Sequence, residues 1–84
     1  MLANNSPIIT LDLHGMYQEE AINAIERTLK SADASTYQIK LIHGYNRGTN
    51  LKDMIMLEYR HDRRIKRVQP GDNLGTTILV LREL

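Results

Sequence analysis

The chain has 84 residues, no cysteine, and 11 Lys and Arg against 10 Asp and Glu. This length allows one modest hydrophobic core, and the absence of cysteine excludes disulfides, Cys-ligated zinc and a thiol nucleophile. It also fits a reducing cytoplasm, which is where we expect the protein to act. No apolar run approaches the roughly 18 residues of a membrane span, and residues 1–10 lack the pattern of a signal peptide, so no membrane partner is expected.

The hydrophobic pattern predicts six elements in the order β-α-β-α-β-β. Residues 1–7 are predicted to be a flexible lead-in and residues 8–84 a single domain. The strands are predicted at residues 8–13, 37–44, 64–70 and 76–81, and the helices at about 17–30 and 51–59, with Asn50 as the N-cap of the second helix.

This order predicts an α/β fold, an α+β two-layer sandwich with a mixed four-stranded sheet and two helices. Each strand-helix-strand unit is expected to join parallel neighbours, and the short turn before the last strand predicts an antiparallel final pair. The ends of the first two strands should therefore lie at one edge of the sheet, where ligands bind in many open α/β sheets.

The first strand ends in "LDLHG", which brings an aspartate and a histidine together. Because side chains alternate along a strand, Asp12 and His14 share one face, roughly 7 Å apart, opposite Leu11 and Leu13. A nearby aspartate favours the protonated imidazole and fixes its tautomer. The pair is therefore a candidate for acid–base chemistry.

The second strand ends in the similar "KLIHG", so we expect His14 and His43 to emerge at the same edge of the sheet. The loop that follows contains Gly44, Arg47, Gly48 and Thr49 before a helix begins, a combination suited to holding a phosphate. Two alternatives stay open. A His-Gly pair is often only a turn with a capping imidazole, and strict alternation places His43 on the core face.

A basic run, "RHDRRIKR", occupies residues 60–67. Its residues Arg63, Arg64 and Arg67 are candidates for binding the backbone of a nucleic acid. The alternative is that these cations complement the dipole at the end of the preceding helix. No metal site is predicted, although Asp12, His14 and His43 could share an ion.

Three segments resemble the small MutS-related (Smr) domain family: "LDLHGMYQEEA", "LIHGYNRGTNLK" and "GDNLGTTILVL". The similarity extends from about residue 8 to residue 81, and suggests a short, stand-alone member. It implies a catalytic role for Asp12 and His14. The nucleic-acid or phosphate-binding candidates are His43, Gly44, Arg47, Gly48, Thr49, Lys52, Arg63, Arg64 and Arg67.

The resemblance also implies nucleic-acid binding, with endonuclease or nicking activity in several members, on DNA beside MutS-like proteins or on messenger RNA at stalled ribosomes. We predict that His14 is a general acid or base oriented by Asp12. An RNA substrate would supply its own 2′-hydroxyl, whereas DNA would need water and favours Mg²⁺ as cofactor. The alternatives are a non-catalytic binding module and an adaptor for a ribosome or a DNA-repair protein.

Overall fold

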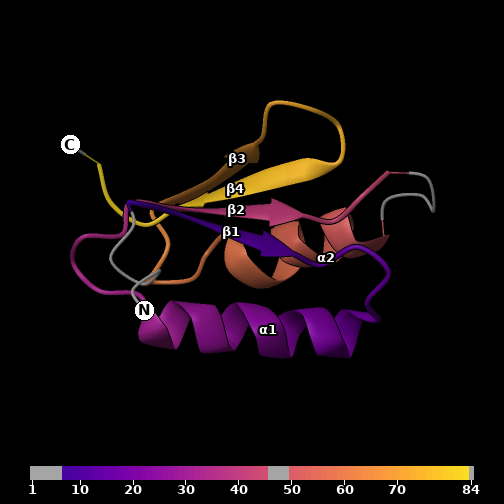
Figure 1. Ribbon diagram of the computed structural model, residues 1–84, viewed down its shortest axis with the longest axis horizontal. Helices are drawn as coiled ribbons and strands as arrows, with labels where there is room; N and C mark the ends of the chain where they lie inside the picture. The colour runs from indigo at the N-terminus through magenta and orange to yellow at the C-terminus, as the bar shows by residue number, and fades with distance from the viewer. Residues whose placement is uncertain (1–6, 46–49, 84) are drawn as a thin grey trace.

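The computed structural model describes residues 7–45 and 50–83 and contains the six predicted elements in the predicted order (Figure 1). They are β1 (Ile8–Asp12), α1 (Gln18–Ser31), β2 (Gln38–Ile42), α2 (Asn50–Tyr59), β3 (Arg67–Pro70) and β4 (Thr76–Val80). Both helices lie on the same side of the four-stranded sheet (Figure 1). The predicted two-layer α/β fold is therefore confirmed.

The predicted flexible lead-in, residues 1–7, lies outside the described residues except for Pro7. The Pro7 carbonyl accepts hydrogen bonds from the backbone N–H groups of Tyr37, at 2.8 Å, and Gln38, at 3.1 Å. This residue is therefore already joined to the sheet.

The strands are ordered β1-β2-β4-β3 across the sheet. β1 and β2 are parallel neighbours, and β4 is antiparallel to both β2 and β3, as expected for a mixed sheet. The expectation that β2 and β3 are also neighbours is wrong, because β4 lies between them. β4 is buried at four of its five positions and suits the centre of the sheet, whereas β3 ends in Pro70, which cannot donate to a ladder and suits an edge.

α1 begins after Tyr17, whose backbone N–H donates to the Glu20 carboxylate at 2.9 Å. This bond satisfies one of the free N–H groups at the start of the helix. The helix buries Ala21, Ile25 and Leu29 against the sheet. The Tyr17 side chain takes no part in this packing and is 82% exposed.

Asn50, the predicted N-cap preceding α2, is instead the first residue of the helix itself. The helix buries Met54, Ile55 and Tyr59 and leaves Leu57 exposed. None of the helices in the described part of the chain is long and apolar enough to cross a membrane.

A group of polar side chains joins α1 to the segment that follows α2. The Arg64 guanidinium donates to both carboxylate oxygens of Glu26, each at 3.0 Å, and to both of Asp62, at 3.0 and 2.7 Å. The hydroxyl of the buried Tyr59 donates to the same Glu26 carboxylate at 2.9 Å. Arg64 is therefore bonded to a residue of α1 that lies 38 positions before it in the chain.

These bonds shift the acidities of the groups involved. The hydrogen bonds from Arg64 hold the pKa values of Glu26 and Asp62 below their ordinary values of 4.5 and 3.8. Burial, together with the bond to Glu26, raises the pKa of Tyr59. Because the carboxylate pKa values are lowered by folding, their stabilising effect is complete above the ordinary values and is lost as the pH falls through the lowered ones.

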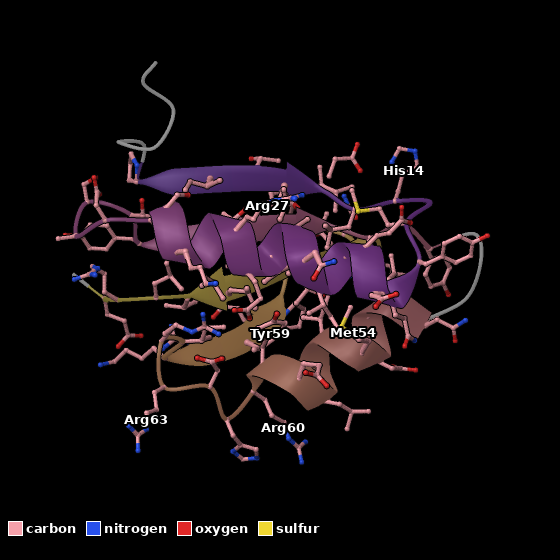
Figure 2. The ribbon with its side chains drawn as sticks, turned by 90° about the horizontal axis from the view of Figure 1, so that it is seen from below. His14, Arg27, Met54, Tyr59, Arg60 and Arg63 are labelled. Carbon is pink, nitrogen blue, oxygen red and sulfur yellow. The ribbon has the colours of Figure 1, made fainter. Side chains whose placement is uncertain are left out.

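We predict that Arg64→Ala lowers the free energy of unfolding by about 1–2 kcal/mol, between the values for an exposed pair and for hydrogen bonds to charged groups. Arg63→Ala is the matched control, because its exposed side chain points away from the fold (Figure 2). Urea unfolding at pH 7 and at pH 3 measures both effects. The difference between wild type and Arg64→Ala should shrink at the lower pH, and an equal effect of the two substitutions would contradict the assigned role of Arg64.

Candidate nucleic-acid site

The pairing of β1 with β2 decides where the two His-Gly motifs point. Asp12 is opposite Ile42 in the ladder, and the Leu13 N–H donates to the Ile42 carbonyl at 2.7 Å. Leu13 and His43, the next residues after the two strands, therefore point to the same face of the sheet, the one covered by the helices. Both residues are buried there, at 0% and 7% exposure. The two motifs are out of register by one residue, so the two histidines lie at the same edge but on opposite faces.

His14 and Asp12 form an exposed pair at the end of β1. The His14 Nδ1 lies 2.7 Å from Asp12 Oδ1, and the side chains are 71% and 56% exposed. A carboxylate oxygen only accepts, so Nδ1 carries the hydrogen, and in the neutral form of the ring Nε2 has the free lone pair. The hydrogen bond from His14 lowers the pKa of Asp12, which keeps this carboxylate ionised at neutral pH. A carboxylate bonded to Nδ1 in this way fixes the orientation of the imidazole ring.

His43 has a different environment. Its Nδ1 lies 2.9 Å from the Gly44 carbonyl oxygen, and its Nε2 lies 2.8 Å from the Thr77 hydroxyl on β4. Because a carbonyl only accepts, Nδ1 donates and Nε2 accepts the hydrogen of Thr77. Both ring nitrogens are thus used within the fold, as in the turn-forming alternative that the sequence left open.

The glycine of each His-Gly motif turns the chain sharply. Gly15 and Gly44 have φ values of +80° and +82°, a backbone conformation that side-chain-bearing residues rarely adopt. A Cβ added at Gly44 would lie 3.6 Å from the Cβ of His14, so the two turns are in contact. The Gly75 carbonyl accepts the N–H groups of His43, at 2.9 Å, and Gly44, at 3.0 Å, which brings the turn before β4 to the same place.

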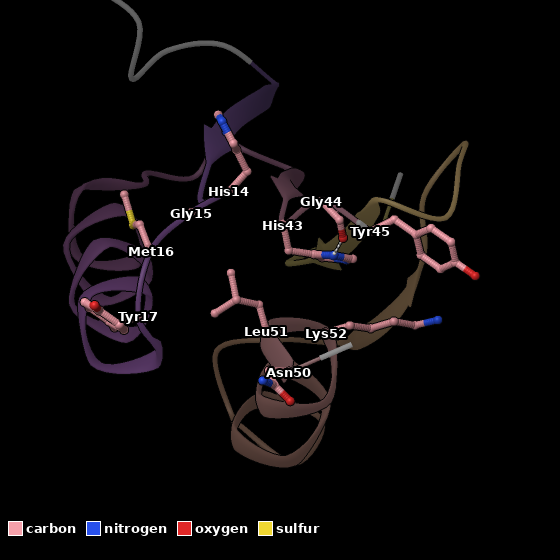
Figure 3. Close-up of a pocket in the computed structure, with 10 residues that line it drawn as sticks. All are labelled: His14, Gly15, Met16, Tyr17, His43, Gly44, Tyr45, Asn50, Leu51 and Lys52. Carbon is pink, nitrogen blue, oxygen red and sulfur yellow. Dashed lines mark hydrogen bonds between the residues drawn. The ribbon is translucent and has the colours of Figure 1, made fainter. Parts of the chain in front are cut away.

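A pocket of about 480 Å³ opens where these turns face the starts of both helices (Figure 3). It is lined by His14, Gly15, Met16, Tyr17, His43, Gly44, Tyr45, Asn50, Leu51 and Lys52. The His14 ring stands at the rim and points away from the centre of the pocket (Figure 3). None of these described lining residues is a carboxylate, and Lys52 together with the start of α2 makes the pocket attractive to anions.

The predicted site residues fall into three groups. His14, His43, Gly44 and Lys52 line the pocket, and Asp12 adjoins it through His14. Arg47, Gly48 and Thr49 lie outside the described residues. The third group is Arg63, Arg64 and Arg67, from the basic run.

The basic run is separate from the pocket: Arg63 and His14 lie at opposite sides of the molecule (Figure 2). Arg64 holds Glu26 and Asp62, and Arg67 pairs with Glu83 and donates to Gln69 at 2.9 Å. Arg63 has no ion-pair partner among the described residues and is exposed.

Sequence reasoning missed the two tyrosines of the pocket. Tyr17 and Tyr45 are 82% and 56% exposed, although an aromatic ring gains from burial. The available signal was their placement, because each follows a His-Gly motif by one or two residues at the predicted binding edge. Met16 and Leu51 were also missed, and both are half-buried beside the core.

The described residues contain no group of three or more His, Cys, Asp or Glu side chains arranged to hold a metal ion. The Asp12, His14 and His43 set, considered from the sequence, is divided between the two faces of the sheet, and the ring nitrogens of His43 are already bonded.

Comparison with known proteins agrees with the fold. The Smr domain family matches residues 11–82, and the chain belongs to that family. In structure, it is similar to the crystal structure of the Smr domain of Thermus thermophilus MutS2, with a TM-score of 0.79 and 25% sequence identity. The match covers 89% of this chain and 99% of the Thermus domain. No curated protein matches the sequence.

We predict that Thr77→Val lowers the free energy of unfolding by about 1–3 kcal/mol, because it leaves the buried Nε2 of His43 without a donor while preserving shape. Thr10→Val is the control, since Thr10 is exposed on β1. Chemical unfolding of the two variants measures the difference. Equal stability of Thr77→Val and wild type would show that the hydroxyl does not hold the ring.

Proposed function

We propose that the chain binds nucleic acid at this pocket and that His14, oriented by Asp12, cleaves the phosphodiester backbone beside it. The observation that carries the proposal is the 2.7 Å contact between His14 Nδ1 and Asp12 Oδ1 on an exposed edge. Membership of the Smr domain family supports a nucleic acid as the ligand.

The chemistry follows from the tautomer of His14. With Nδ1–H held by Asp12, Nε2 takes the proton of an attacking hydroxyl, and the carboxylate stabilises the imidazolium that forms. On RNA the 2′-oxygen then attacks the adjacent phosphorus and the bond to the 5′-oxygen breaks. The products are a 2′,3′-cyclic phosphate and a 5′-hydroxyl, whose proton comes from water.

The phosphate would be held in the pocket, on the side of Gly44 away from His14. Because Gly44 has no side chain, the nucleic-acid backbone can pass close to it on its way from the pocket to the rim at His14. Lys52 and the N–H groups at the start of α2 supply the positive potential, and we propose that Arg47, Gly48 and Thr49 add to it. On DNA water would be the nucleophile, and the Mg²⁺ ion expected for that reaction finds no preformed set of ligands among the described residues.

A non-catalytic binding module is the second candidate. It is favoured by the direction of the His14 ring, which points away from the pocket and need not touch a ligand bound there (Figure 3). An adaptor that docks on a ribosome or a DNA-repair protein would not bind free nucleic acid, and a direct binding assay separates it from both.

We predict that His14→Ala abolishes cleavage of labelled RNA or DNA, assayed with Mg²⁺ and with chelator. General acid–base assistance typically contributes about 10²- to 10⁴-fold in rate, which a gel assay resolves. Asp12→Asn should cause a smaller loss, because it keeps a hydrogen bond and removes only the charge. The fold should survive, since both side chains are exposed.

Thr10→Val, purified in parallel, is the control for contaminating nuclease, because Thr10 is exposed on β1 two residues before Asp12. A folded His14→Ala protein that cuts as fast as wild type would refute the catalytic assignment. If neither protein cuts but both bind equally, the binding-module alternative holds.

We also predict that the salt dependence of the affinity, compared between variants, shows which basic residues contact the bound strand. For a short oligonucleotide of about four nucleotides, Lys52→Ala should reduce the slope of log affinity against log salt by about 0.7, the value for one single-strand phosphate. Arg63→Ala should change the slope only for a strand long enough to reach the other side of the molecule (Figure 2). A flatter slope in Arg63→Ala with the short strand would instead place binding at the basic run.

A further inference from the structure

The tyrosines of this chain are divided between the fold and the pocket. The chain has four tyrosines and neither phenylalanine nor tryptophan. Tyr59 is 2% exposed and Tyr37 is half-buried, whereas Tyr17 and Tyr45 are 82% and 56% exposed and both line the pocket. Both exposed tyrosines are therefore at one site.

The two exposed rings stand on opposite sides of the pocket (Figure 3). Tyr17 is carried by the start of α1 and Tyr45 by the segment after β2, and the half-buried side chains of Met16 and Leu51 also line the space. The volume of about 480 Å³ is within the range of pockets that hold small ligands, which are mostly apolar with a few polar groups. The Tyr45 ring is directed outward (Figure 3), and both rings are exposed, so a planar ligand would stack on either one at the edge of the pocket.

The charges around the pocket suit a ligand that is aromatic and anionic at once. Lys52 has no ion-pair partner among the described residues, and the positive end of α2 faces the same space. The described lining contains no carboxylate that would repel a phosphate. A nucleotide unit combines the two properties, with a base for the tyrosines and a phosphate for Lys52.

We propose that the pocket takes an unpaired base, stacked on Tyr17 or Tyr45, so that the chain selects single-stranded over duplex nucleic acid. This inference rests on the proposed function and specifies its substrate. A base within a duplex is stacked on its neighbours and is not free to lie against a tyrosine, whereas unpaired bases stack readily on aromatic side chains. Every base has a flat face, so the selection is for strandedness and not for sequence.

Three oligonucleotides of the same length test the proposal: a single strand, its duplex, which carries twice as many phosphates, and an abasic strand that has the backbone of the single strand without its bases. Wild type should bind the single strand most tightly. At least one of Tyr17→Ala and Tyr45→Ala should weaken that binding by about 5- to 100-fold, while Tyr→Phe at the same position should retain it within about twofold. The abasic strand should bind all of these proteins equally, because only the phosphate contacts remain.

Leu57→Ala is the matched control, since it removes an exposed apolar side chain, 76% exposed, from α2 outside the pocket. Duplex binding as tight as single-strand binding, or unchanged affinity in both tyrosine-to-alanine variants, would overturn the inference while leaving nucleic-acid binding intact. Failure of wild type to bind any of the three oligonucleotides would overturn the proposed function itself.

Discussion

The last hydrogen bond of the β1–β2 pair, from the Leu13 N–H to the Ile42 carbonyl, sets the position of both His-Gly turns. Because the strands are parallel, both turns leave the sheet at one edge. The positive φ of Gly15 lets the chain turn toward α1, and that of Gly44 lets it turn beside the Gly75 carbonyl, to which the Gly44 N–H donates. The pocket is the space that these turns leave between the sheet and the two helices. Its existence depends on this pairing more than on any single side chain.

The same pairing gives two histidines in nearly identical sequence contexts different roles. His14 is on the outer face, hydrogen-bonded to a carboxylate and open to solvent, and His43 is on the inner face, bonded at both ring nitrogens. A shift of one residue in the register would instead place both histidines on the same face. The geometry therefore distinguishes an exposed histidine, whose ring is bonded to Asp12 through Nδ1, from a buried one whose two ring nitrogens are both bonded within the fold.

Much of this could be predicted from sequence, because the element order follows from local periodicity and turn residues. The face of His14 also followed from alternation with Leu11 and Leu13. The central place of β4, the contact between the two turns and the bonds of Arg64 could not be predicted, since each depends on partners distant in the chain. Glu26, for example, lies 38 residues from Arg64. Exposure of Tyr17 and Tyr45 likewise became visible only when the neighbouring elements were in place.

The bonds of Arg64 also limit how the chain can diverge. Arg64 is the shared partner of Glu26 and Asp62, so its substitution leaves two carboxylates unpaired, whereas substitution of either carboxylate leaves Arg64 paired with the other. Arg64 is therefore the most restricted of the three positions. Arg60 and Arg63, which have no ion-pair partner among the described residues, carry no such restriction. Within one short basic segment, evolution can therefore adjust the surface charge at Arg60 and Arg63, while Arg64 remains bonded to Glu26 of α1 and to Asp62.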